Sequence, residues 1–418
     1  MKFRFTNQPL LWVPSSFFAM GLVNQILVVV AAIMFRNLGM SYTEAAAYAS
    51  QFYLAYAIQP LLAPLVDTFK SRKFYVIGTQ IFISLGFGLV ALCLQLPVYA
   101  AVVIALLWLI SIAGSIQDVA SNGVYLNALD NTRQAKFIGL QSLSWGIGPI
   151  VGAGLMVSYS GTLYASLGDW VAVWQIIFAL LSLILLLVAV FHHLVLPPDR
   201  VAVHPIAGLP ERKLATAFTT FFKKEAIAKM IAFAFFYRFS QGLLEKIIPF
   251  FMMDPISKGG LGLDNTALGK INSLGFSAFL LGSILGGWYI AKRGLKPSLL
   301  TLCLAVNIPN IFYLLLSIYQ PDEFWLIATV IPLEKFFFGM GATGHMVYMM
   351  QQLAPGAFRT THYAFGTGLM GLCLWSMGSA SGFLVEMLGY RSFFVVVLVA
   401  AIPSLLVTWW APFRDENV

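Results

Sequence analysis

Charged residues are scarce in this sequence. Only 10% of its 418 residues are Asp, Glu, Lys or Arg, whereas 59% are hydrophobic, and soluble domains are usually about 25% charged. So few charges cannot cover a surface that faces water, and the composition therefore indicates an integral membrane protein. Its three cysteines, Cys93, Cys303 and Cys373, are too few and too far apart for a disulfide framework or a metal motif. We expect no metal and no cofactor.

Long polar segments are scarce as well, and continuous apolar runs take their place. A membrane-spanning helix needs about 20 mainly apolar residues, whereas a β-barrel would show alternating segments of about 10 residues. The sequence therefore predicts an all-α integral membrane protein with twelve transmembrane helices. The expected spans are 10–34, 43–66, 74–95, 98–127, 137–158, 171–195, 226–252, 265–290, 298–319, 324–351, 361–384 and 392–411.

One long polar connection divides these spans. It predicts an N-terminal six-helix half (1–195), a cytoplasmic central loop (196–225) and a C-terminal six-helix half (226–418). Lys and Arg gather in the central loop and in alternate short loops, and such an excess marks the cytoplasmic side, so both termini are expected in the cytoplasm. Contact with anionic headgroups accounts for the net charge of +8, so the bilayer is an expected partner and nucleic acid is not.

Two of the cytoplasmic loops resemble each other. When "APLVDTFKSRK" (63–73) is aligned with "GWYIAKRGLK" (287–296), Ala63 meets Gly287 and Asp67 meets Ala291. The pair resembles the loop signature of the major facilitator superfamily, which has a glycine, an aspartate four residues later, then arginine, glycine and basic residues. The residues kept here are Asp67, Arg72 and Lys73 in the first loop and Gly287, Lys292, Gly294 and Lys296 in the second. The resemblance implies two pseudo-symmetric halves around a central cavity, with these loops involved in conformational change.

A second resemblance narrows the family. The stretch "QDVASNGVYLNALDNTRQAKFIGLQSLSWGIGPIVGAG" (117–154) and the later "EKFFFGMGATGHMVYMMQQLAP" (334–355) resemble muropeptide permeases of the AmpG type and their relatives, the acetyl-CoA transporters. This resemblance implies a bacterial inner membrane and an amino-sugar–peptide or oligosaccharide as substrate. Some siderophore permeases share the pattern, so a siderophore remains an alternative.

Ionisable residues inside the membrane are costly and are functional candidates by default. The deep ones fall in the fourth, seventh and tenth spans, which in the family's fold line the cavity together with the first. They are Asp118, Arg238, Glu245, Lys246, Glu334, Lys335 and His345. Helical spacing also aligns five residues as one polar stripe: Ser111, Ser115, Asp118, Asn122 and Tyr125.

These patterns define the candidate site. Substrate-binding candidates are Asn24, Gln25, Asn122, Arg238, Gln241 and Lys335, and candidates for proton coupling or gating are Asp118, Glu334 and His345. Because adjacent helical residues point about 100° apart, Glu334 and Lys335 are expected to reach different partners, one toward Arg238 and the other toward the cavity.

Structural alternatives stay open for several of these residues. Arg238 and Glu334 could only pair across the bundle, and Asp118 or His345 could only pack between helices. Glu245 and Lys246 are expected to snorkel toward the outer surface, and the Phe-rich runs 233–239 and 336–338 to face lipid or pack.

No ATP-binding G-x-x-x-x-G-K-[ST] loop occurs. The sequence therefore predicts a secondary transporter that takes up a polar small molecule with protons, by alternating access. Arg238 and Lys335 near mid-membrane favour a substrate with an acidic group. We expect a monomer. Efflux by the same fold is an alternative. A membrane-embedded enzyme is a distant one, because neither H-E-x-x-H nor G-x-S-x-G occurs.

Overall fold

The computed structural model describes residues 8–59, 61–62, 66, 70–198, 216, 218–355 and 358–413. This part of the chain is helical and contains no strand. Nine of its helical stretches are long and apolar enough to cross a membrane. They are Pro9–Asn37, Arg72–Cys93, Tyr99–Ala128, Gly139–Leu167, Trp170–Val195, Asn265–Arg293, Leu295–Tyr319, Phe324–Leu353 and Thr361–Trp409.

Three departures explain why the described residues give nine such stretches where twelve spans were expected. The expected span 43–66 is divided into α3 (Tyr42–Gln51) and α4 (Tyr53–Ala57), and part of it lies outside the described residues. The span 226–252 is interrupted between α12 (Ile227–Phe236) and α13 (Phe239–Met253). The last two spans run together as α18 (Arg359–Val399), which is followed by α19 (Ala401–Trp409).

A single glycine separates the two spans inside α18. Gly389 has φ +71° and ψ 166°, which is not helical. Glycine adopts positive φ without the steric cost that a Cβ atom brings. The chain can therefore turn there with almost no loop.

The other helices follow the apolar runs closely. In the first part of the chain they are α1 (Pro9–Gln25), η1 (Ile26–Val30), α2 (Ala31–Asn37), α6 (Arg72–Cys93), α7 (Tyr99–Ala128), α8 (Asn131–Pro149), η2 (Ile150–Met156), α9 (Val157–Leu167) and α10 (Trp170–Val195). In the second part they are η3 (Ile256–Lys258), α14 (Asn265–Arg293), α15 (Leu295–Asn307), η4 (Ile308–Asn310), α16 (Ile311–Tyr319), α17 (Phe324–Tyr348) and η5 (Met349–Leu353). The segments η1, η2 and η5 are π-helical, a form that is frequent at functional sites.

Contacts group the chain into two compact units. Unit 1 holds residues 1–40, 61–203 and 265–273, and unit 2 holds residues 41–60, 204–264 and 274–418. The contacts thus place 41–60 with residues from the second part of the chain and 265–273 with residues from the first. The division into halves at 1–195 and 226–418 stays a prediction.

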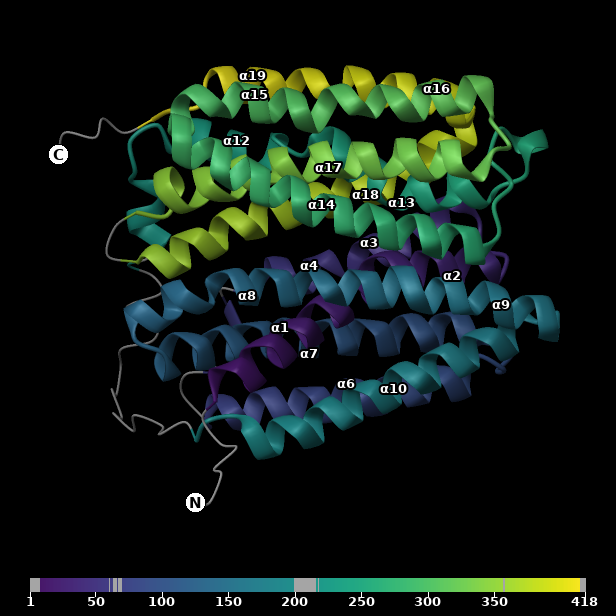
Figure 1. Cartoon of the computed structure of the whole chain (residues 1–418), viewed down its shortest axis with the longest axis horizontal. Coiled ribbons are helices and arrows are strands. Elements are labelled where there is room, and N and C mark those ends of the chain that lie inside the picture. Colours follow the sequence, from purple (N-terminus) through teal and green to yellow (C-terminus); the bar gives the residue numbers. More distant parts are fainter. Residues whose placement is uncertain are drawn as a thin grey trace. The chain divides into compact units, whose positions relative to one another are not determined.

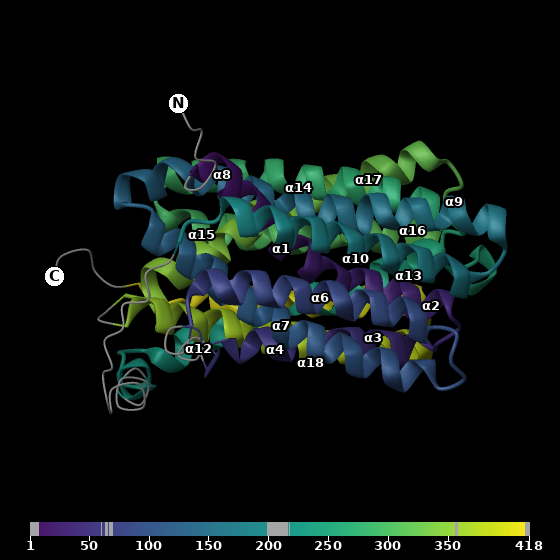
Figure 2. The same cartoon turned by 90° about the horizontal axis from the view of Figure 1, so that it is seen from below.

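In unit 1, α6 packs against both α7 and α10 (Figures 1 and 2). Helix α1 packs along α8, where a Cβ atom on Gly148 would lie 2.2 Å from the Leu22 nitrogen. Only glycine permits backbones to approach so closely.

In unit 2, α18 packs against α3, α4 and α13, and α15 packs against α17. Small residues again bring helices together, because a Cβ atom on Gly382 would lie 2.2 Å from the Tyr42 carbonyl oxygen. One end of this packing is held by Asp254, whose carboxylate accepts hydrogen bonds from the hydroxyls of Tyr42 and Tyr390.

Candidate functional site

Arg238 lies at the interruption of the seventh expected span. Helix α12 ends at Phe236, α13 begins at Phe239, and Arg238 is the N-cap residue with φ −105° and ψ 25°. The guanidinium therefore places a positive charge at the break between the two helices.

The Arg238 guanidinium contacts neutral groups. Its Cζ lies 4.9 Å from the centre of the Phe338 ring, and Nη1 donates to the thioether of Met370 at 3.5 Å. Its Nε is buried without a hydrogen-bond partner, and among the described residues no carboxylate lies within 4.0 Å of it. The expected pair between Arg238 and Glu334 is therefore not formed, which leaves this charge without a counter-ion in the described structure.

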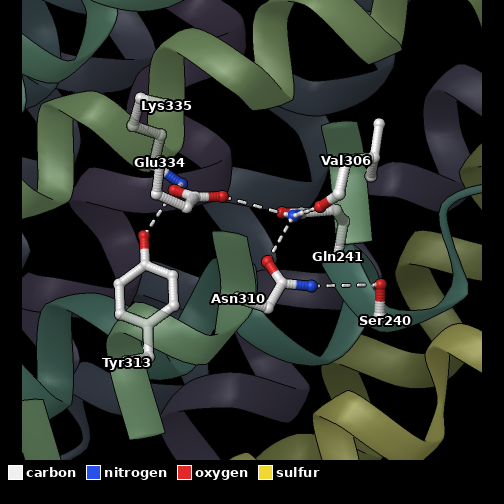
Figure 3. A network of polar contacts seen from close by, with 7 residues as sticks. All are labelled: Ser240, Gln241, Val306, Asn310, Tyr313, Glu334 and Lys335. Carbon is white, nitrogen blue, oxygen red and sulfur yellow. Dashed lines mark hydrogen bonds and ion pairs between the residues drawn. The ribbon is translucent and has the colours of Figure 1, made fainter. Parts of the chain in front are cut away.

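Glu334 is the centre of a polar network inside unit 2 (Figure 3). Its side chain is fully buried. The Tyr313 hydroxyl donates to Oε2 at 2.5 Å, the Gln241 amide donates to Oε1 at 3.3 Å, and Lys335 Nζ lies 3.2 Å from Oε2. Both carboxylate oxygens thus have partners, as a buried carboxylate requires.

The network continues from Gln241 to the break between α15 and α16 (Figure 3). The Gln241 amide also donates to Asn310 Oδ1 at 3.0 Å and to the Val306 carbonyl at 3.3 Å. Ser240 donates to Asn307 Oδ1 at 2.7 Å. Sequence reasoning missed this side of the site. A usable signal was present in "VNIPN" (306–310), where a proline and two asparagines interrupt an apolar run.

Lys335 corrects the expectation that two adjacent charges must reach different partners. Its ammonium group pairs with Glu334, and it also lies 5.5 Å from the centre of the Phe338 ring. The Cα–Cβ directions do differ by about 100°, but the four-carbon lysine side chain is long enough to turn back. Phe338 contacts the cations of both Lys335 and Arg238, so it belongs to the site although its run was assigned to packing or lipid.

Lys246 and Glu245 form a second charged pair, in which the lysine is buried and the glutamate is half-buried. Lys246 is fully buried rather than snorkelling, and its Nζ lies 3.9 Å from Glu245 Oε2. The Tyr53 hydroxyl donates to the same carboxylate at 2.6 Å, and Lys246 Nζ lies 5.0 Å from the centre of the Tyr53 ring. The expectation was wrong for Lys246 because α3 and α18 cover this part of α13.

His345 lies between aromatic rings. It is fully buried, stacks on Tyr237 with ring centres 4.8 Å apart, and meets the edge of Phe233 at 5.6 Å. The ring nitrogens have no side-chain hydrogen-bond partner among the described residues, and the backbone of Ala234 lies close to the ring. This environment favours the packing alternative, and a role in proton coupling stays a prediction.

The candidates in unit 1 occupy α1 and α7. Asn24 is half-buried and Gln25 is buried, and Gln25 directly precedes the π-helical η1. Asp118 is half-buried, while Asn122 is exposed and donates to the Asp118 carbonyl of its own helix at 2.9 Å. Their roles in binding or coupling stay predictions.

The loop candidates of unit 1 secure helix ends. Arg72 lies against Gly123, where a Cβ atom would come within 2.5 Å of its Cδ. Lys73 Nζ donates to the carbonyls of His193 at 2.9 Å and Leu196 at 2.8 Å, at the end of α10. Asp67 lies outside the described residues.

The corresponding loop residues of unit 2 contact aromatic rings. Lys292 Nζ lies 5.1 Å from the Trp288 ring centre, and Lys296 Nζ lies 5.8 Å from that of Phe413. Nothing lies within 4 Å of a Cβ atom placed on Gly287. Gly294, with φ +83°, allows the sharp connection between α14 and α15.

Across the residues the structure describes, no group of three or more His, Cys, Asp or Glu side chains could hold a metal ion. The site therefore consists of paired and unpaired charges, amides and aromatic rings. Such groups can bind a charged solute or carry a proton, and they form no nucleophile–base arrangement of the kind that enzymes use.

A family model for the Major Facilitator Superfamily matches residues 15–382. The chain belongs to this superfamily and is a multi-pass membrane transporter. The expected resemblance is thereby confirmed. The alternative of a membrane-embedded enzyme is set aside, because the similar proteins are transporters.

Particular relatives agree with the narrower resemblance. The chain is 22% identical over 361 residues to the anhydromuropeptide permease of Escherichia coli K12, covering 84% of this chain and 69% of that protein. It is 22% identical over 370 residues to the putative transporter AmpG 4 of Rickettsia conorii, covering 85% and 84%. The predicted similarity to muropeptide permeases of the AmpG type is therefore confirmed.

Solved structures show the same fold. The nucleoside transporter NupG superposes with a TM-score of 0.71 at 18% identity, covering 96% of this chain and 97% of that one. A D-xylose–proton symporter superposes with a TM-score of 0.75 at 12% identity over 97% of each chain. At these identities the likeness shows the fold alone.

Proposed function

We propose that this protein is a proton-coupled importer of a small solute that carries an acidic group, with an amino sugar or muropeptide fragment as the substrate class. It would act by alternating access, with twelve membrane crossings in an inner membrane and both termini in the cytoplasm. The anion-binding group is Arg238, and the proton-carrying group is Glu334.

The observation that carries the proposal is the Arg238 guanidinium, which has no counter-ion in the part of the chain that the structure describes. Arg238 is half-buried and its Nε is buried. Removing a cation from water is costly unless it is paired and hydrogen-bonded, yet the partners of this one are a phenyl ring and a thioether. A carboxylate on a ligand would pair with this charge and complete its hydrogen bonds. The similarity to an anhydromuropeptide permease supports a ligand of this class.

A binding experiment tests the substrate class. Thermal unfolding of the detergent-purified protein is measured with anhydromuropeptides, their uncharged amide derivatives, neutral disaccharides and siderophores. A ligand at a hundred times its dissociation constant adds about 2.7 kcal/mol to the stability of the folded state. We expect anhydromuropeptides to raise the Tm and the amide derivatives to leave it unchanged.

Arg238→Gln should abolish the Tm shift, whereas Arg293→Gln, which alters an exposed arginine that contacts Tyr289, should keep it. An equal shift in Arg238→Gln and wild type would reject Arg238 as the anion-binding group. If only siderophores raised the Tm, the substrate class would be siderophores and not muropeptide fragments.

Glu334 is the preferred proton carrier because it is fully buried and yet linked to a cation and two neutral donors. Protonation would free Lys335 from its partner, so the carboxylate and the site's charge can change together. In proteoliposomes with an imposed pH gradient, Glu334→Gln should lose gradient-driven accumulation and keep substrate exchange. Glu225→Gln, on the exposed surface, is the matched control. Wild-type uptake that ignores the gradient would contradict proton coupling.

A further inference from the structure

Helix α7 carries polar residues on two different faces. Asp118 belongs to the stripe with Asn122, but Gln117 points about 100° away from it. Gln117 and Ser121 are four residues apart and share a face. Both are buried, with 0% and 1% of their surface exposed. This second face therefore puts two polar side chains into the interior of unit 1.

These side chains have no protein partner there. Both the amide oxygen and the amide nitrogen of Gln117 are buried without a hydrogen bond to any described residue, and so is the Ser121 hydroxyl. Buried polar atoms are almost always bonded to protein or to ordered water. Three orphaned atoms on one face of one helix thus require an explanation.

The facing helix supplies a further orphaned atom. Gln80 on α6 is fully buried, and its Oε1 lies 2.8 Å from Nδ1 of His192, which is also fully buried. Because an amide oxygen only accepts, the histidine nitrogen must donate. The Gln80 amide nitrogen then remains, buried and without a partner in the described structure.

The packing of α6 on α7 puts Gln80 and Gln117 at the same level. These helices are antiparallel neighbours. Arg72 meets Gly123 near one end, and Gly86 meets Ile110 further along. Position 80 lies between these two crossings and so falls beside the turn of α7 that contains Gln117. The two amides are nevertheless not bonded to each other, so something else has to fill their hydrogen bonds.

We infer that unit 1 holds ordered water between α6 and α7, bound by the side chains of Gln80, Gln117 and Ser121. These residues offer donors and acceptors together, and a buried water needs about two to four polar partners. Such water lies behind the polar stripe that carries Asp118. It hydrates the interior of unit 1, and nothing in the proposed transport function requires it.

The sign of a stability change tests this inference. Gln117→Met keeps the length of the side chain and removes both polar atoms. If water is bound, the variant loses its hydrogen bonds and leaves Gln80 and Ser121 without partners, so Tm falls by about 2 °C or more. If the site is dry, the variant removes two unsatisfied atoms, and Tm rises.

Ser121→Ala removes one polar atom, and the smaller side chain fits without strain. We expect this variant to lower the Tm as well. Gln241→Met is the matched control, since Gln241 is equally buried but bonded to protein. It should lower Tm in either case and so calibrate the assay. A raised or unchanged Tm in both Gln117→Met and Ser121→Ala would overturn the inference.

A direct observation is also accessible. A cryo-EM map that resolves ordered water elsewhere in the protein should show a peak between the amides of Gln80 and Gln117, which disappears in Gln117→Met. Direct contact between the two amides, or no peak in the wild-type map, would overturn the inference.

Discussion

The pair formed by Glu334 and Lys335 gives the sharpest test of the site, because its partners are buried to different extents. Glu334 is fully buried, whereas 22% of the Lys335 side chain is exposed. Removing one partner of a buried pair costs about 3–5 kcal/mol, because it leaves a charge uncompensated. The two single substitutions should therefore differ in cost.

Lys335→Met leaves the Glu334 charge fully buried. Tyr313 and Gln241 still donate to it, so we expect a loss near the lower limit, about 3 kcal/mol. Glu334→Gln leaves the lysine charge, which is partly exposed and lies beside the Phe338 ring. Its cost should be that of impaired hydrogen bonds, about 1–2 kcal/mol.

Thermal unfolding of both single variants and of Glu334→Gln/Lys335→Met completes a double-mutant cycle. Lys335→Met should have the lowest Tm, and the double variant should lie close to Glu334→Gln. Equal losses in the two single variants, or a double variant below both, would refute the described pairing.

Three further outcomes follow from contacts elsewhere. Gly282→Ala should lower Tm by several degrees, because the new Cβ would lie 1.8 Å from the Phe336 carbonyl oxygen, whereas Gly287→Ala on the same helix should be neutral, since its Cβ meets open space. Tyr390→Phe removes one donor from the buried Asp254 carboxylate and should cost about 1.5–3 kcal/mol in thermal unfolding. An unchanged Tm would show that this bond is not formed. Lys73→Met should cost about 1 kcal/mol, because two carbonyls at the end of α10 lose their donor. Hydrogen exchange should then show faster opening of that helix end, and unaltered exchange would contradict the assigned capping role.

Much of the architecture could be read from local composition. Runs of about 20 apolar residues are dictated by bilayer thickness, so most helix positions were predicted to within a few residues. The interruption at Arg238 was not visible in this way, because "FFYRFS" (235–240) is as apolar as its surroundings apart from the one arginine. The short helices of residues 42–57 were also not predicted, because one continuous span was expected in this region.

The candidate residues were found on a similar basis, since ionisable groups in apolar runs stand out in any membrane sequence. The hydrogen-bond and ion-pair partners of these residues could not be predicted from composition in this way. Tyr313 and Asn310 come from other helices, and they contact the site only because those helices pack against α13 and α17. Hydrogen bonds between residues distant in the sequence depend on packing, and no local spacing encodes them.

The sequence by itself thus determined that this is a helical membrane protein, and its loop motifs pointed to the transporter family to which it belongs. The reason is that hydrophobic length and short motifs are local properties. Only the tertiary structure decided that Glu334 pairs with Lys335, that Lys246 is buried, and that Arg238 has no counter-ion among the residues described. Long side chains can turn toward several neighbours, and the packing of distant helices selects which of these contacts forms.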